Sequence, residues 1–235
     1  MGDYYKTHED KYNPFLSLRK PVVVKVALDL NPSDFQLKTG SVEGINLAIA
    51  KIAKDISREY KCTAFAIFNE INIVIKNPQV LSNKNKLESQ YVAGLFAQEV
   101  FMRYNNLICS TQPVFVSANV FNLYEDKIRS YLFNRQFKGF NNYVFALGSK
   151  LFSHNQLKNK KKEEILSIIN EISPSLKSIE KSIKHGYTSL EGVEIELNDV
   201  GRIAKNELKI TTGKTYKLDN INNLTVIKDE IDEDI

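Results

Sequence analysis

Asn69 and Glu70 are the residues whose setting most suggests chemistry. They separate two apolar runs within residues 64–75, which read AFAIFNEINIVI. β-Branched and aromatic residues of this kind favour strands, and the short polar connection predicts a hairpin with Glu70 at its tip. Hard cations such as Mg²⁺ prefer carboxylate oxygens, and two such cations can hold a triphosphate for phosphoryl transfer. The alternative is a surface turn with an ordinary glutamate.

Composition is that of a globular chain with one large domain, or one domain and an appendage. The 235 residues are 43% hydrophobic and 26% charged, with a net charge of +4 at pH 7. No apolar run is long enough to span a bilayer, so we expect no membrane partner. Cys62 and Cys109 form neither a metal motif nor a disulfide framework. We therefore expect a cytoplasmic, reducing location. The mild basicity permits a nucleic-acid partner without requiring one.

The hydrophobic periodicity predicts the order strand, helix, strand, strand, helix, strand. The predicted elements are a strand at 21–30, a helix at 41–56, the hairpin at 64–75, a helix at 87–104 and a strand at 112–123. Three further helices are predicted at 124–134, 141–152 and 163–171.

This order is typical of a ferredoxin-like palm, an α+β fold whose antiparallel-rich sheet carries helices on one face. We divide the chain into an N-terminal arm (1–19), a palm-like domain (20–172), a C-terminal α/β extension (173–226) and an acidic tail (227–235). Such a fold hosts many functions, so function must be argued from the site.

Short motifs continue beyond the predicted hairpin. Residues 120–126 read VFNLYED, and residues 131–136 read YLFNRQ. This ordered set resembles the tRNA-His guanylyltransferase family of 3′-to-5′ RNA polymerases, which commonly carry VFNL, an acidic helix start, YF or YL, and WRQ. Residues 21–27 are similar to the family's first strand, usually VVRIDGR, and the hairpin is similar to its second metal strand. Residues 157–166 resemble a later LKG…KNEL segment.

The resemblance implies a palm-type nucleotidyltransferase domain that uses Mg²⁺, a nucleoside triphosphate and an RNA 5′ end. It also implies a homo-oligomer or a larger protein assembly. The implied nucleotide- or RNA-binding residues are Lys86, Ser89, Arg135, Gln136, Asn142, Lys158 and Lys162. For Arg135 and Gln136 the alternative is a structural bridge from helix to sheet. For the lysine run 158–162, which could bind phosphates, the alternative is a solvated loop.

The sequence departs from the family at the metal ligands. Ala27 stands where the first metal-binding Asp is expected, and Asn69 stands where the second is expected, so only Glu70 remains. Two-metal chemistry needs anionic oxygen ligands to concentrate Mg²⁺. Asp29 lies two residues beyond Ala27 and faces the same side of a strand. Asp29 and Glu70 are therefore the candidate metal ligands, with Asp34 nearby.

Further departures concern groups that would contact the nucleotide. Residues 116–119 read VSAN where the family has Phe-Asp-x-Arg, and Gln90 follows Ser89 where a Lys is expected. Lys138 and Phe140 replace an Asp and a His, although Asn142 keeps the family's Asn. Losing the Lys removes a charge-assisted contact to the triphosphate.

We therefore expect a divergent member of this family that has lost ordinary two-metal catalysis. It would act as a nucleotide- or RNA-binding module, or as a structural subunit of an assembly. Two alternatives stay open. In one, Asp29 and Glu70 hold Mg²⁺ and the chain still adds nucleotides to an RNA 5′ end. In the other, the chain is a scaffold that acts through protein–protein contacts alone.

Overall fold

Two strands at the centre of the fold are apolar along nearly their whole length. They are β2 (Val22–Asp29) and β4 (Glu70–Ile75), and every residue of β4 is buried. Strands covered on both faces read as continuous apolar runs. The computed structural model describes residues 14–30, 39–81, 87–108, 114–172, 184–195, 197, 207–209, 215–220 and 223–228. Asp34, Lys86 and most of the N-terminal arm lie outside these residues.

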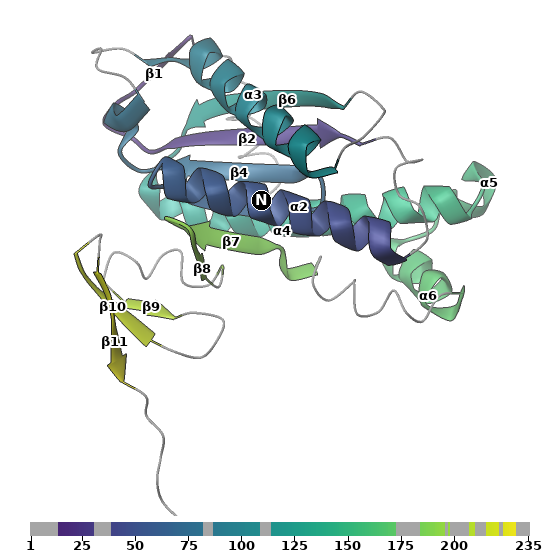
Figure 1. The fold of residues 1–235 in the computed structure, drawn as a ribbon. Helices are drawn as coiled ribbons and strands as arrows, with labels where there is room; N and C mark the ends of the chain where they lie inside the picture. The colour runs from purple at the N-terminus through teal and green to yellow at the C-terminus, as the bar shows by residue number, and fades with distance from the viewer. Residues whose placement is uncertain are drawn as a thin grey trace, which may run out of the picture.

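The main sheet has six strands in the order β6-β2-β4-β3-β7-β8 (Figure 1), and every neighbouring pair is antiparallel. The remaining strands are β3 (Thr63–Ile67), β6 (Phe115–Asn122), β7 (Tyr187–Leu190) and β8 (Val193–Ile195). β3 and β4 form the predicted hairpin. Glu70 begins β4 and lies opposite Ala27 of β2 and Ile67 of β3.

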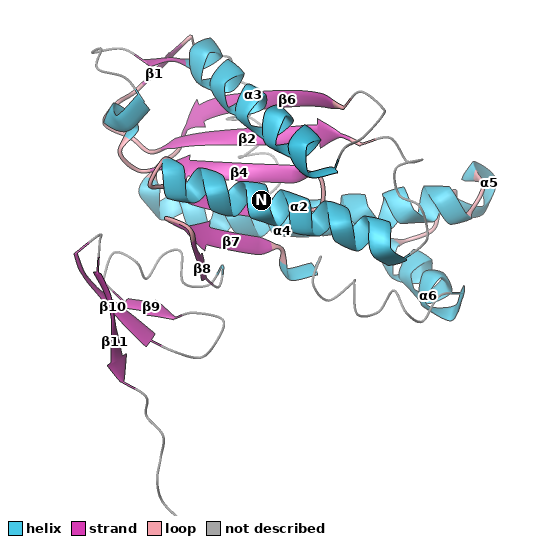
Figure 2. Cartoon of the chain, in the orientation of Figure 1, coloured by secondary structure: helices cyan, strands magenta, loops and turns pink. Residues whose placement is uncertain are grey.

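Helices cover both faces of this sheet (Figure 2). Helix α2 (Thr39–Glu59) packs on β3 and β7, and α3 (Ser89–Ile108) packs on β6 and β2, both in front of the sheet in this view. Helix α4 (Glu125–Leu151) crosses behind it and is followed by α5 (His154–Leu157) and α6 (Lys162–Ile172). The α+β class and the antiparallel sheet are confirmed. The predicted placement of helices on one face holds for α2 and α3, and α4 covers the other face.

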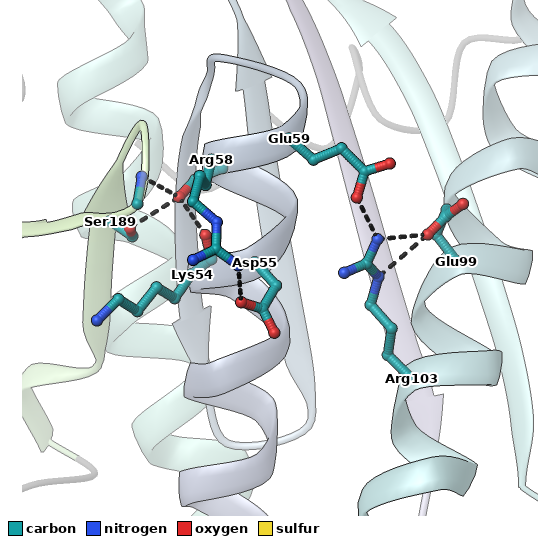
Figure 3. Close-up of polar contacts among 9 residues, drawn as sticks. Lys54, Asp55, Arg58, Glu59, Glu99, Arg103 and Ser189 are labelled. Atoms are coloured by element: carbon teal, nitrogen blue, oxygen red, sulfur yellow. Dashed lines mark hydrogen bonds and ion pairs between the residues drawn. The ribbon is translucent and has the colours of Figure 1, made fainter. Parts of the chain in front are cut away.

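Buried isoleucines at helical spacing attach α2 to the sheet. Ile45, Ile49, Ile52 and Ile56 are each at most 5% exposed, as an amphipathic helix requires. Polar contacts add to this packing (Figure 3). The hydroxyl of Ser57 lies 2.7 Å from that of Ser189 on β7, and Arg103 of α3 donates to Glu59 of α2 at 2.6 Å.

Smaller elements complete the described chain. They are β1 (Phe15–Leu16) paired with β5 (Leu87–Glu88), the 3₁₀ helix η2 (Pro78–Leu81), and a separate antiparallel sheet of β9 (Glu207–Lys209), β10 (Thr215–Asn220) and β11 (Asn223–Lys228). None of the helices in the described ranges is both long and apolar enough to cross a membrane.

The structure differs from the sequence prediction along α4. One continuous helix replaces the two helices predicted at 124–134 and 141–152. Gly139 lies in its middle, and a Cβ there would stand 2.6 Å from Cγ1 of Ile67 on β3. The missing side chain thus lets α4 approach the sheet closely without ending the helix. A second difference is that β7 and β8 extend the palm sheet, although the predicted boundary at residue 172 assigns them to an extension.

Candidate functional site

The hairpin tip is fixed to β2 by a pair of hydrogen bonds at Asn69. The backbone N–H of Leu28 donates to the Asn69 carbonyl at 2.9 Å, and the Asn69 side-chain amide donates to the Leu28 carbonyl at 2.8 Å. Phe68, the first residue of the turn, has a φ of 53°, in the left-handed region that tight turns use. These contacts set the direction in which Glu70 enters β4.

The Glu70 carboxylate is buried and fully engaged by neighbouring side chains. Arg135 of α4 donates from Nε to Oε1 at 2.7 Å, and its Nη2 forms the second contact, to Oε2. Asn72 also donates to Oε1, at 2.7 Å, and Tyr131 donates its hydroxyl proton to Oδ1 of Asn72 at 2.8 Å. The four residues form one hydrogen-bonded network between β4 and α4.

This arrangement follows from the cost of burying charge. An ionised carboxylate away from water is strongly unfavourable unless it is paired and hydrogen-bonded. Arg135 supplies both the opposite charge and a planar two-point contact. The side chains of Arg135 and Glu70 are each 7% exposed. Arg135 therefore already provides Glu70 with the positive charge that a bound metal ion would otherwise supply.

Asp29 lies elsewhere on the same face of the sheet. It ends β2, is exposed, and pairs in register with Phe115 of β6, whereas Glu70 is opposite Ala27. Strand alternation directs Asp29 to the face of Glu70, as predicted. Among the residues that the structure describes, no three His, Cys, Asp or Glu side chains group closely enough to hold a metal ion.

The predicted nucleotide-binding residues that the structure describes are spread over several elements. Ser89 begins α3 beside β5, and its backbone N–H donates to the Pro14 carbonyl at 3.1 Å. Because β4 runs away from Glu70 before the chain reaches α3, Ser89 lies near the opposite end of the sheet. Gln136 donates its side-chain amide to the carbonyl of His185, two residues before β7, at 2.7 Å, and its contact with a nucleotide or RNA stays a prediction.

The remaining predicted residues lie toward the distal half of α4 and beyond it. Asn142 and Lys158 are exposed. The Lys162 ammonium lies 5.0 Å from the ring centroid of Phe137 and 5.6 Å from that of Phe140, and it pairs with Glu163 at 3.4 Å. Contacts of this length are cation–π interactions. Lys162 thus attaches the start of α6 to α4.

No protein-family model matches the chain, and no curated protein matches it. Solved structures do. A bacterial tRNA(His) guanylyltransferase-like protein in complex with ATP superposes with a TM-score of 0.56 at 16% identity, covering 80% of this chain and 85% of that one. Its complex with GTP gives the same score and identity, and tRNA(His) guanylyltransferase from Saccharomyces cerevisiae gives 0.53 at 14%, covering 83% of this chain and 95% of the yeast one. The chain has the tRNA(His) guanylyltransferase fold.

In this version of the guanylyltransferase fold, part of the sheet beside Glu70 is left exposed. Helix α4 reaches Asn72 and Glu70 of β4 and Ile67 of β3, but the ends of β2 and β6 near Asp29 are accessible. We call this surface the open sheet face. It comprises Lys25, Ala27 and Asp29 of β2 and their register partners Asn119, Ser117 and Phe115 of β6.

Phe115 is the residue of this face that the sequence argument missed. It is 72% exposed, and Ser117 and Asn119 are exposed on the same side of the strand. The signal was present, since residues 115–121 read FVSANVF, and residues two apart share one face of a strand. Asn72 and Tyr131, which complete the Glu70 network, were also missed as site residues.

Proposed function

We propose that the chain binds nucleotides, free or within single-stranded RNA, on its open sheet face, and that it has lost two-metal nucleotidyl transfer. One observation carries the proposal. The Glu70 carboxylate, the remaining acid of the hairpin tip, is bound by Arg135 and Asn72 and faces Ala27 across the ladder. This part of the site is organised as a structural ion pair.

The donor groups present do not fit a resident pair of magnesium ions. Mg²⁺ takes octahedral oxygen coordination and usually relies on carboxylates. Alanine at position 27 offers no ligand, and the Asn69 amide carries no charge and donates to Leu28. Asp29 would have to act with a carboxylate whose two oxygens already accept from Arg135 and Asn72. These residues therefore do not supply the ligand set that two-metal nucleotidyl transfer needs.

The open sheet face has the groups that recognise bases. An exposed aromatic ring on a strand gives a stacking platform for a nucleobase, as in sheet-based RNA-binding domains. Phe115 supplies such a ring, and the exposed Ser117 and Asn119 supply hydrogen-bonding groups beside it. The bacterial protein of the same fold is in complex with ATP in one structure and GTP in another, which supports a nucleotide as the ligand.

The test is fluorescence anisotropy with a labelled single-stranded RNA and a labelled ATP analogue. We expect binding that persists in EDTA and weakens about five- to hundredfold in Phe115→Ala, because base–aromatic stacking contributes about 1–3 kcal/mol. Phe145→Ala is the matched control, since Phe145 is an exposed aromatic of α4 at 44% exposure. Equal loss in both variants, or no binding by the wild-type chain, would reject the open sheet face as the site.

A transfer assay separates binding from catalysis. The chain is incubated with Mg²⁺, nucleoside triphosphates and RNA labelled at its 3′ end, and 5′ extension is followed on a gel. We expect no extended product. Mg²⁺-dependent extension that disappears in Glu70→Gln and Asp29→Asn would show that the two carboxylates still act together, and the enzyme alternative would replace the proposal.

A further inference from the structure

A small apolar pocket lies where α4, α5 and α6 meet, and we call it the α5–α6 pocket. It encloses about 210 Å³ and is lined by Phe152, Gln156, Leu157, Lys160, Ile165 and Ile168. A Cβ at Gly148 of α4 would lie 3.0 Å from Ile165 and 3.3 Å from Leu157, so this glycine lets the helices converge. A cavity of about 150 Å³ accepts a molecule the size of benzene. The α5–α6 pocket therefore has room for one branched aliphatic or aromatic side chain.

The lining of this pocket sets the chemistry of its occupant. Ile165 is 0% exposed, and Phe152, Leu157 and Ile168 are half-buried. Lys160 is the charged residue of the lining, and it too is half-buried. An apolar group gains free energy by leaving water for such a lining, and a carboxylate beside it would meet the Lys160 ammonium.

The surface next to the pocket carries further lysines. Residues 158–164 read KNKKKEE. Lys162 is already engaged by two aromatic rings of α4. Within the described residues, none of the other lysines, Lys158, Lys160 and Lys161, forms an ion pair. These cations favour an occupant with several carboxylates, because complementary charges direct association.

The chain itself contains a segment of this chemistry. Residues 229–235 read DEIDEDI and lie outside the described residues. Ile231 is preceded by two acidic residues and followed by three. Its branched aliphatic side chain suits the size of the pocket. Lys160 lines the pocket, and Lys158 and Lys161 are within two residues of it, so carboxylates on either side of Ile231 would find a cation nearby.

Covalent attachment favours this segment over an acidic segment of another molecule. A tethered group has an effective concentration on the order of millimolar at a site within its reach. Residues 198–206, which precede β9, can extend to about 30 Å. Even a weak contact would therefore be made first within the same chain.

We propose that residues 229–235 bind to the α5–α6 pocket of their own chain, with Ile231 in the pocket and the neighbouring carboxylates on Lys158, Lys160 and Lys161. Exposed ion pairs are individually weak, so the isoleucine holds the segment and the charges direct it. The contact keeps polyanions away from these lysines. Helices α5 and α6 follow the C-terminal end of α4 (Figure 2), whereas the open sheet face is formed by β2 and β6. The inference is therefore independent of the proposed nucleotide binding.

The first experiment is NMR of the full chain labelled with ¹³C at the δ1 methyl groups of isoleucine. Ile168→Val and Ile231→Val each remove one signal and so assign the two methyl groups. We expect a nuclear Overhauser effect (NOE) between them, which arises only when the methyl groups are in close contact. The NOE should weaken at high salt, because salt screens the attraction between the lysines and the carboxylates.

Charge reversal tests the part played by the lysines. The NOE should be lost in the triple variant Lys158→Glu, Lys160→Glu, Lys161→Glu. The matched control makes the same change at three exposed lysines of α2 and the turn after it, and it should keep the NOE. This control is Lys51→Glu, Lys54→Glu, Lys61→Glu. Loss of the NOE in both triple variants would contradict specific pairing at the α5–α6 pocket.

A mixing experiment identifies the molecule that supplies the segment. Ile231→Asn should shift the Ile168 methyl signal, and adding unlabelled wild-type chain should leave the shifted signal in place. A return to the wild-type position would mean that a second copy supplies the segment. An Ile168 signal that is the same in the wild type and in Ile231→Asn would mean that the pocket takes another occupant. Either result would overturn the proposal.

The second experiment measures the NaCl concentration at which the full chain elutes from immobilised heparin, a polyanion. Ile231→Asn leaves the net charge unchanged but should elute at a higher concentration than the wild type, because the lysines become free to displace counterions. Leu47→Asn is the matched control at an exposed apolar residue of α2, 65% exposed, and should elute with the wild type. Equal elution of Ile231→Asn and the wild type would overturn the shielding of the lysines.

Discussion

Arg135 and Glu70 are 65 residues apart in sequence and meet as an ion pair whose side chains are each 7% exposed. The pair joins α4 to the strand that begins at the hairpin tip. A buried pair is costly to break from one side, because the remaining charge loses its partner. Removing one member of the pair and measuring the free energy of unfolding therefore tests whether the site has a structural role.

Replacing Arg135 with Met should lower the free energy of unfolding by about 3–5 kcal/mol, because Glu70 would stay buried without a cation. Methionine keeps most of the apolar stem. Urea denaturation measures the change. The double variant Arg135→Met, Glu70→Leu should be more stable than Arg135→Met alone, since it removes the isolated charge.

The control for this prediction is the exposed pair of Arg58 with Asp55, whose side chains are 67% and 27% exposed. Arg58→Met should change stability by less than about 1 kcal/mol, because solvent screens such pairs. Equal losses in Arg135→Met and Arg58→Met would contradict a buried structural pair at Glu70.

The Tyr131 hydroxyl gives a second test of the same network. Tyr131→Phe removes the donor to Oδ1 of Asn72 at 2.8 Å, and Asn72 is 0% exposed. An unsatisfied buried acceptor costs about 1–3 kcal/mol. Tyr124→Phe is the matched control, because the Tyr124 hydroxyl accepts from Lys20 at the surface. Thermal unfolding should show a lower melting temperature for Tyr131→Phe and an unchanged one for Tyr124→Phe.

Replacing a helical glycine with alanine should change stability in opposite directions at Gly139 of α4 and at Gly94 of α3. Gly139→Ala should lower stability by about 1–3 kcal/mol, because its Cβ would overlap Ile67, 2.6 Å from Cγ1. Gly94→Ala should raise stability by about 0.5–1 kcal/mol through helix propensity, since nothing described lies within 4 Å of the added Cβ. Urea unfolding measures both.

A double-mutant cycle with Ile67→Ala then assigns the cause at Gly139. If overlap with Ile67 is responsible, Gly139→Ala should cost less in the Ile67→Ala background than in the wild type. The same cost in both backgrounds would mean that the loss arises elsewhere along α4.

The order of strands and helices could be predicted because apolar residues recur with a different period in each kind of element. Residues 21–30 and 64–75 are continuous apolar runs, and the isoleucines of α2 recur at helical spacing, so local pattern sufficed. The polar hairpin tip at Asn69 and Glu70 was also predictable. The pairing of Arg135 with Glu70 was not predictable, because the position of a residue in a motif does not reveal which side chain it meets. The nucleotide contact that the resemblance implies for Arg135 stays a prediction.

The rest of the site depends on how α4 crosses the sheet. That crossing brings Arg135 to Glu70 and Tyr131 to Asn72, contacts between residues about sixty positions apart that no local period encodes. It also decides which strand ends stay exposed, and hence why Phe115 is accessible. The close approach at Gly139 depends equally on a tertiary neighbour.

Cys62 predicts how stability changes in alkaline solution. Burial, followed by the nearby Glu191 carboxylate, raises the pKa of its thiol from 9.0 to about 12. Below pH 9 the thiol is protonated in both the folded and the unfolded chain. Above pH 9 the unfolded chain loses this proton and the folded chain keeps it, so stability falls as pH rises toward 12, by at most about 1.4 kcal/mol per pH unit for one group.

The measurement compares the wild-type chain with Cys62→Ala by urea unfolding between pH 8 and pH 9.8. Burial, followed by nearby carboxylates, also raises the pKa values of Tyr60 and Tyr187 above 10.0, so both tyrosines begin to contribute near the top of this window. They do so in both proteins, and their contribution cancels in the comparison. Cys62→Ala should be less stable at pH 8 but should lose less stability across the window. Parallel pH curves for the two proteins would mean that the Cys62 thiol ionises as readily in the folded chain as in the unfolded one.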